Sequence, residues 1–175
     1  LDQLAGESSE APRYSCACPV CGQTRRFHEN LVDSGGDEFV RCAAESNVFF
    51  FDRVTAGTVR MAQAARAGGA FVFFEPSSIS ADRGLFDAAL SYAHVVKYSV
   101  DRIREPLDHR LSSGFIEIQT QGARGLRFRK HSLAPDWVNL PALRTSSVAD
   151  TSGAGDWCTA GFLHALFSGR GGSEL

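Results

Sequence analysis

The sequence predicts an α/β fold, a mostly parallel sheet with flanking helices, and two observations predict it. Short continuous apolar runs, such as NVFFF (47–51) and the run within AFVFFEP (70–76), are typical of strands that are buried on both faces. Segments of helical length and composition separate these runs, so strand and helix alternate along the chain. This alternation favours right-handed crossovers, and in such sheets ligands bind beyond the carboxyl ends of the strands.

Local signals place each element after residue 46. The Ala-rich segment 55–69 ends in two glycines, which commonly stop a helix. Within 82–93, apolar residues recur with the i, i+3, i+4, i+7 spacing of a helix face. The expected order is strand 47–51, helix 55–69, strand 70–76, helix 82–93, strand 94–99, a helix over 100–111 with a break at Pro106, strand 114–120, its hairpin or edge partner 125–131, a loop containing Pro135 and Pro141, and a final helix after the glycine turn near residue 155.

The composition is that of a globular protein with one substantial core. Of the 175 residues, 43% are hydrophobic and 22% are charged, and a domain of this size buries roughly 70% of its unfolded surface. The formal net charge of -2 gives no electrostatic footprint for nucleic acid or for an anionic membrane. The sequence shows neither a bilayer-spanning apolar run nor the layout of a signal peptide. We therefore expect a soluble, cytoplasmic protein without nucleic-acid or membrane partners.

Changes of composition divide the chain into three parts. Residues 1–13 are polar and are expected to be a flexible lead-in. Residues 14–46 form a cysteine-containing segment with little regular periodicity, and residues 47–175 hold the α/β pattern. The chain begins with Leu1 and stops shortly after the last expected helix. We therefore expect it to be a fragment of a longer protein.

Three of the five cysteines lie in the segment CACPVCG, where Cys18 and Cys21 have the spacing of a zinc knuckle. A closed structural site needs four ligands; Cys42 can supply a third, and Cys16 or His28 the fourth. The usual second Cys-x-x-Cys is missing, so a loop without metal is the alternative. A disulfide framework is not expected, because the number of cysteines is odd and nothing suggests export.

A glycine-rich turn, DTSGAGD (150–156), directly precedes the last apolar helix. Gly153 and Gly155 allow a tight turn and a close approach of the backbone to a ligand. The first N–H groups of the helix, with the positive end of its dipole behind them, make an anion site for which phosphate is the natural ligand. Asp156 could then accept the proton of an attacking hydroxyl. The alternative is an ordinary helix cap formed by Asp150, Thr151 or Ser152.

The order Asp150-Thr151-x-Gly153-Ala154-Gly155-Asp156 resembles a signature of the ribokinase-like (PfkB-type) family of sugar and nucleoside kinases. The following segment, WCTAGFLHAL, is similar to that family's helix. The resemblance covers about residues 47–169. It implies ATP and Mg²⁺ as cofactors, Asp156 as the catalytic base, and a cofactor-binding signature that includes Asp150 and Thr151. It also implies that the backbone through Gly153, Ala154 and Gly155 forms the anion hole for the transferred phosphoryl group.

A second motif, IQTQGARGLRF, places Thr120, Gly122 and Gly125 between two expected strands, similar to the family's nucleotide-binding turn. The spacing alone is a weak signal, because hairpins often carry glycines. Its position ahead of the DTSGAGD turn strengthens it. Glu75 ends a strand where the family has an acid and a proline, so it either faces the site or is an ordinary exposed acid.

The sequence departs from the family pattern after the strand 94–99. The family usually carries Asn-x-x-Glu there, a motif that helps to organise magnesium and phosphate, whereas this chain reads SVDR (99–102). Asp101 or Glu105 are the candidate substitutes, and the metal arrangement would then be altered. Lys97, near the end of the same strand, either offers a positive charge to phosphate or extends its ammonium group to solvent.

Together the motifs predict ATP-dependent phosphoryl transfer to a hydroxyl of a small sugar-like or nucleoside-like substrate. Asp156 would be the general base, and the fragment alone is expected to be inactive. The alternative is a ribokinase-like scaffold with impaired catalysis, which binds a ligand or regulates and carries a zinc knuckle for interaction. A structural Zn²⁺ ion and a homodimer both stay open at this stage.

Overall fold

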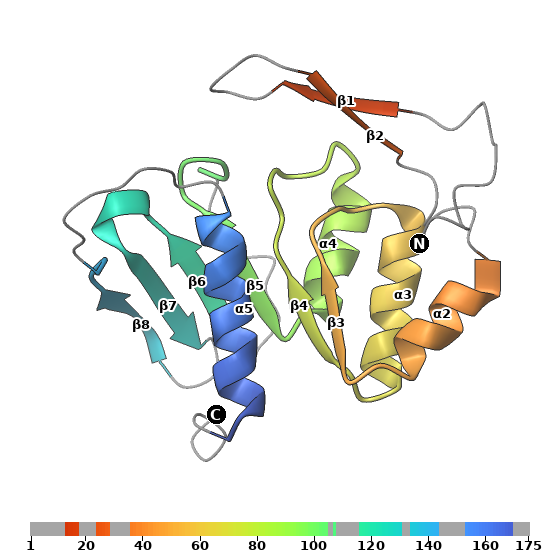
Figure 1. The fold of residues 1–175 in the computed structure, drawn as a ribbon. Helices are drawn as coiled ribbons and strands as arrows, with labels where there is room; N and C mark the ends of the chain where they lie inside the picture. Colours follow the sequence, from red (N-terminus) through yellow and green to blue (C-terminus); the bar gives the residue numbers. More distant parts are fainter. Residues whose placement is uncertain are drawn as a thin grey trace.

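The computed structural model describes residues 13–17, 24–28, 36–104, 107, 116–130, 134–143 and 153–169 (Figure 1). A six-stranded sheet contains strands in chain order, with β3 at one edge and β8 at the other. β3 to β6 pair in parallel, and β7 and β8 extend the sheet as antiparallel strands. The strands are β3 (Val48–Phe51), β4 (Phe71–Phe74), β5 (Val95–Ser99), β6 (Ile116–Thr120), β7 (Leu126–Lys130) and β8 (Ala134–Leu140). The helices around them are α2 (Gly36–Ala44), α3 (Ala56–Ala67), α4 (Arg83–Tyr92), the 3-10 turn η3 (Gly122–Arg124) and α5 (Ala154–Phe167).

Helices cover the two faces of the sheet differently. Because β3, β4 and β5 follow one another in order, right-handed crossovers put α3 and α4 on the same face. The core on that face contains strand residues such as Phe74 and Val96. α5 crosses the other face (Figure 1), where Phe162 packs against the buried Phe73 with ring centroids 5.8 Å apart. Strand side chains therefore alternate between two apolar layers, which explains why the strands read as continuous apolar runs.

The direction of α5 brings its N-terminus to the carboxyl edge of the parallel strands. Near the end of the helix, Phe167 meets Phe71, the first residue of β4, with ring centroids 5.7 Å apart. Near its beginning, Gly155 accepts a hydrogen bond from Lys97 of β5. α5 thus runs antiparallel to the parallel strands, and its N-terminus lies at their carboxyl ends.

Helix ends follow from local side-chain chemistry. Thr55 caps α3 through a reciprocal capping box with Thr58, in which each side chain accepts from the other residue's backbone N–H. Asp82 caps α4 by accepting from the Leu85 N–H at 2.9 Å. These caps satisfy backbone donors that would otherwise lack partners at the start of each helix.

The segment before β3 is more regular than the sequence indicated. β1 (Arg13–Ala17) and β2 (Thr24–His28) form a separate two-stranded antiparallel sheet. α2 packs against α3, and its Ala43 belongs to the main core. Gly68 permits this packing, since a Cβ there would lie 2.0 Å from the Ala44 carbonyl oxygen. The α/β unit therefore includes α2, which precedes the expected start at residue 47.

Most expected elements are confirmed, and two expectations are wrong. The strands and helices predicted between residues 47 and 99, the hairpin after residue 114 and the last helix are all present. The expected helix over 100–111 is not formed in the described residues 100–104, which make a turn, and the expected loop around Pro135 is strand β8. The irregular segment 14–46 contains two strands and a helix. Within the described part of the chain, no helix is long and apolar enough to cross a membrane.

Candidate active site

The N-terminus of α5 is exposed at the carboxyl edge of the sheet. Gly153 is the N-cap residue, with a φ of 77° that glycine adopts without a Cβ clash. Asp150, Thr151 and Ser152, the alternative capping residues, lie outside the described part. The first i→i−4 hydrogen bond of α5 runs from the Trp157 N–H to the Gly153 carbonyl oxygen, at 2.9 Å. The N–H groups of residues 154–156 precede it, in the part of a helix where the backbone offers no helical acceptor. Residues 153–157 are all exposed, which leaves the positive end of α5 open to an anion.

Asp156 lies in the first turn of α5, as the sequence predicted for a base beside an anion site. A Cβ built on Gly153 would come 3.9 Å from Asp156 Oδ2. The carboxylate therefore lies near the N-cap, and the missing side chain of Gly153 leaves space beside it. An acid in this place is stabilised by the positive end of the helix dipole.

A polar network joins α5 to the sheet just behind this turn. Lys97 is 2% exposed, and its ammonium group forms an ion pair with Glu75 Oε1 and donates to the Gly155 carbonyl oxygen at 3.0 Å. The Thr159 hydroxyl donates to Glu75 Oε2 at 2.5 Å. A Cβ on Gly155 would lie 3.6 Å from Glu75 Oε1 and 3.7 Å from Lys97 Nζ. The ion pair therefore lies directly against Gly155.

This network changes the interpretation of two residues. Lys97 does not extend to solvent, because it is buried, and its charge is matched by Glu75. Glu75 is not an ordinary exposed acid, because its side chain is 19% exposed and contacts the first turns of α5 through Thr159. Thr159 carried no sequence signal. The pairing could have been found from the strand register, since Phe74 lies opposite Val96 and the next position along each strand brings acid and base together.

The second glycine turn lies at the same edge of the sheet. Thr120 ends β6 opposite Ser99 of β5, and its carbonyl oxygen accepts from the Val100 N–H at 3.1 Å. Gly122 begins the short turn η3 and Gly125 follows it, with φ values of 58° and 99°. A Cβ on Gly125 would also lie 2.2 Å from a backbone oxygen at the end of β8. The turn is thus held between β6 and β8 close to the carboxyl ends of the parallel strands.

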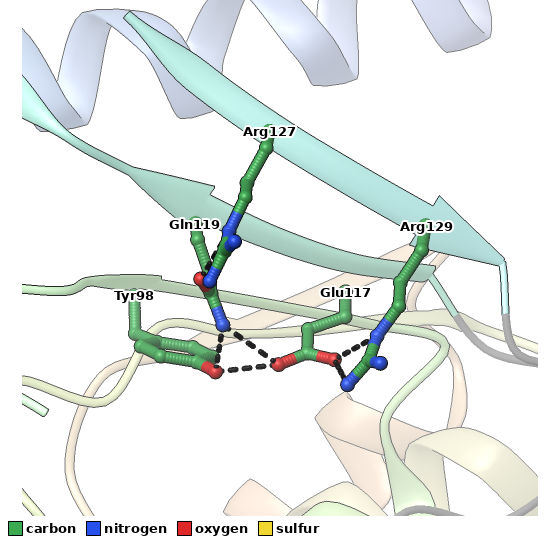
Figure 2. Close-up of polar contacts among 5 residues, drawn as sticks. All are labelled: Tyr98, Glu117, Gln119, Arg127 and Arg129. Carbon is green, nitrogen blue, oxygen red and sulfur yellow. Dashed lines mark hydrogen bonds and ion pairs between the residues drawn. The ribbon is translucent and has the colours of Figure 1, made fainter. Parts of the chain in front are cut away.

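A buried polar cluster supports this hairpin on the sheet face opposite α5 (Figure 2). Glu117 is fully buried and accepts from Arg129 Nε at 2.8 Å and Nη2 at 2.7 Å. The Tyr98 hydroxyl donates to Glu117, and Arg127 Nε donates to Gln119 at 2.7 Å. Both guanidinium groups lie 4.3 to 4.4 Å from the centre of the Trp137 ring in β8, a distance typical of cation–π contacts. The cluster ties β5, β6, β7 and β8 together next to the turn.

The predicted metal ligands are only partly placed. Cys16 lies in β1, and Cys42 is an exposed residue of α2, whereas Cys18 and Cys21 fall outside the described residues. Among the residues that the structure describes, no three His, Cys, Asp or Glu side chains are grouped to hold a metal ion. The zinc knuckle stays a prediction. Asp101, the described substitute for the family's metal-organising acid, is exposed in the turn after β5.

Solved structures with a similar fold are kinases. A ribokinase from Giardia lamblia matches with a TM-score of 0.65 at 16% identity, over 94% of this chain and 56% of its own. A nucleoside kinase from Burkholderia thailandensis in complex with inosine matches at 0.60 and 18%, over 84% and 51%. An uncharacterised sugar kinase from Pyrococcus horikoshii in complex with ATP matches at 0.58 and 16%, over 92% and 58%. A scan of the sequence against protein-family models finds no match.

These likenesses confirm the predicted fold class. The chain has the α/β fold of the ribokinase-like sugar and nucleoside kinases, with a mostly parallel sheet and flanking helices. It spans about half the length of the solved structures that it matches.

Proposed function

We propose that this chain is part of an ATP-dependent kinase that transfers a phosphoryl group to a hydroxyl of a small sugar-like or nucleoside-like substrate. The observation that carries the proposal is the open N-terminus of α5, which has Gly153 as its left-handed cap and Asp156 in its first turn. This arrangement lies at the carboxyl edge of a parallel sheet, which is where α/β proteins bind ligands. A kinase fold and the sequence DTSGAGD support the same reading.

The chemistry assigned to the turn is positioning and proton transfer. Backbone N–H groups of Ala154, Gly155 and Asp156 would stabilise the negative charge of a transferring phosphoryl group. Asp156 would accept the proton of the attacking hydroxyl. Little covalent chemistry is required of the protein in phosphoryl transfer, because catalysis comes mainly from orientation and electrostatic stabilisation.

The two glycine turns fit a nucleotide at this edge. Gly122 leaves the hairpin turn without a side chain where a Cβ would meet no atom within 4 Å, so a flat ligand can approach the backbone closely there. Gly125 instead lets the turn pack against the end of β8. Thr120 ends the strand before this turn. ATP supplies the phosphoryl group when bound, and Mg²⁺ is implied by the resemblance; such ions are usually held by one or two carboxylates together with substrate phosphates. Asp101 is the acid within the altered motif SVDR.

Replacement of the proposed base tests the function. In the full-length protein, Asp156→Asn should lower kcat by about 10²–10⁴-fold, with ATP binding retained, because only proton transfer is lost. Asp37→Asn is the matched control, since Asp37 is also an exposed acid in the first turn of a helix, α2. Turnover would be followed by ADP release against a panel of sugars and nucleosides. Equal turnover in both variants would remove Asp156 from the mechanism.

The same panel separates the alternative of a ligand-binding scaffold with impaired catalysis. This alternative is favoured by the SVDR segment, which replaces the family's Asn-x-x-Glu after β5. A scaffold would bind ATP or a substrate in calorimetry while producing no ADP with any acceptor. A working kinase would release ADP with at least one acceptor, and the release would depend on Asp156.

A further inference from the structure

The network behind the α5 turn joins residues that are far apart in the sequence. Glu75 follows β4, Lys97 belongs to β5 and Thr159 lies in the second turn of α5. The contacts are an ion pair between Lys97 and Glu75, and hydrogen bonds from Lys97 to the Gly155 carbonyl oxygen and from Thr159 to Glu75 Oε2. Thr159 is itself buried, and its hydroxyl also lies 3.3 Å from the Gly155 carbonyl oxygen. Two strand ends are thus connected to one helix terminus by polar contacts.

Burial makes these contacts hard to exchange for water. A charge that is removed from solvent must be paired and hydrogen-bonded, or the protein is strongly destabilised. Lys97 has three N–H donors, and two of them are assigned to Glu75 and Gly155. Glu75 uses one carboxylate oxygen for Lys97 and the other for Thr159. The geometry of each group therefore constrains that of the next.

The two ends of α5 are held by different means. Toward its C-terminus, apolar contacts such as Phe162 on Phe73 and Phe167 on Phe71 attach the helix to the sheet. Such contacts are non-directional and tolerate sliding more readily than hydrogen bonds, which lose strength steeply with misalignment. The polar network therefore fixes the position of the first turn, whereas the apolar contacts fix how the helix lies on the sheet.

We propose that Glu75, Lys97 and Thr159 are positioning residues that fix the first turn of α5 against the ends of β4 and β5. They set the place of the backbone N–H groups of residues 154–156 and of the Asp156 carboxylate, and they touch neither substrate nor phosphate. Their positional role stands on the contacts; their effect on catalysis rests on the proposed kinase function. A displacement of about 1 Å in such a site can cost on the order of 100-fold in rate.

Thr159 offers the cleanest test, because its hydroxyl can be removed without removing a charge. Thr159→Val keeps the branched shape and loses the donor to Glu75, whereas Thr159→Ser keeps the donor. Phe162→Leu is the matched control, since it weakens the apolar attachment of the same helix. Backbone amide hydrogen exchange of Trp157, Cys158 and the residue at 159 would be measured in the full-length protein without substrates, beside that of residues 163–167.

The expected result is a local effect. Thr159→Val should speed exchange in the first turn by about 10-fold, as the loss of one charge-assisted hydrogen bond allows, with little change in residues 163–167. Thr159→Ser should resemble the wild type, and Phe162→Leu should not affect the first turn selectively. Where kinase activity is present, kcat/KM should fall about 10-fold or more in Thr159→Val and recover in Thr159→Ser.

Two results would overturn the positional role: equal exchange in Thr159→Val and Thr159→Ser, or faster exchange spread evenly along α5. The exchange measurement needs no substrate, so it does not depend on the proposed function. Failure of that function would instead show in Asp156→Asn, through unchanged turnover. A protein with local exchange changes but no Asp156-dependent activity would keep the positional role and lose the kinase proposal.

Discussion

The buried ion pair between Glu117 and Arg129 should be a costly polar contact to break. Glu117 is fully buried, and Arg129 approaches its Oε2 with two nitrogens (Figure 2). In Arg129→Met the carboxylate loses this cation but keeps hydrogen bonds from Tyr98 and from Gln119 Nε2 at 3.2 Å. Removal of one member of a buried pair costs about 3–5 kcal/mol. Because two neutral donors remain, we expect the lower end, about 3 kcal/mol in the free energy of unfolding.

A neighbouring arginine supplies the control. Arg127 lies on the same face of β7 and contacts the same Trp137 ring, but it donates to the neutral amide of Gln119. Arg127→Met removes a similar side chain and leaves no buried carboxylate without its cation, so a cost of about 1 kcal/mol is expected. In a cycle completed by the single variant Glu117→Gln, the double variant Glu117→Gln/Arg129→Met should cost less than Arg129→Met alone, with a coupling energy of about 1 kcal/mol or more in magnitude.

Urea unfolding followed by circular dichroism measures these free energies, and an unchanged m-value would show that the unfolded reference is comparable. The reasoning fails if Arg129→Met costs no more than Arg127→Met, or if the double-variant cycle shows no coupling. Either result would mean that the pair behaves like a solvent-exposed salt bridge, which contributes about 0–1 kcal/mol.

Two further predictions concern single positions. Gly125→Ala should destabilise the β6–β7 hairpin and raise the KM for ATP, because Gly125 has a φ of 99° and a Cβ would lie 2.2 Å from the Leu140 carbonyl oxygen. Gly69→Ala is the control, since Gly69 has a φ of 88° but no atom within 4 Å of the added Cβ. Equal losses of stability in both variants would contradict the steric argument. Burial and, secondarily, Arg66 lower the pKa of His94, whose Nδ1 accepts a backbone N–H of β4 at 3.0 Å. The neutral ring is therefore favoured by folding, so its contribution is complete above the ordinary pKa of 6.5 and is lost as the pH falls below that value. Urea unfolding at pH 7.5 and 5.5 should show a larger loss in the wild type than in His94→Asn, and equal losses would contradict this assignment.

Sequence patterns predicted the elements whose signals are local. The run in β4 is apolar on both sides because α5 covers one face and α3 and α4 cover the other. The expected burial of β3 on both faces is only partly met, because Phe50 is 46% exposed. The start of the last helix was placed correctly, because Gly153 has the left-handed conformation and the helix begins directly after it. In these cases the backbone preference of a few residues and the burial of neighbouring side chains point to the same structure.

Tertiary context decided the elements that were missed. β8 contains Pro135 and was expected to be a loop, but it is the edge strand of the sheet, where a missing N–H can face away from the partner strand. In the described residues 100–104 the expected helix is replaced by a single turn, in which the Ser99 carbonyl oxygen accepts the N–H groups of Arg102 and Ile103 while the Val100 N–H donates to β6. The network of Glu75, Lys97 and Thr159 depends on strand register and on the placement of α5, neither of which a local pattern contains.

The ion pair between Lys97 and Glu75 predicts how Lys97 should affect phosphate binding. Its ammonium group is neutralised by Glu75, so the positive field at the α5 turn is expected to come from the helix N-terminus, which carries roughly half an elementary charge. In Lys97→Met, Glu75 would lie next to Gly155 without its cation, and repulsion should weaken ATP binding. Glu75→Gln/Lys97→Met removes both charges and should recover much of that loss. Calorimetric titration of the full-length protein with ATP separates the cases: if Lys97 bound phosphate directly, the double variant would bind ATP no better than Lys97→Met.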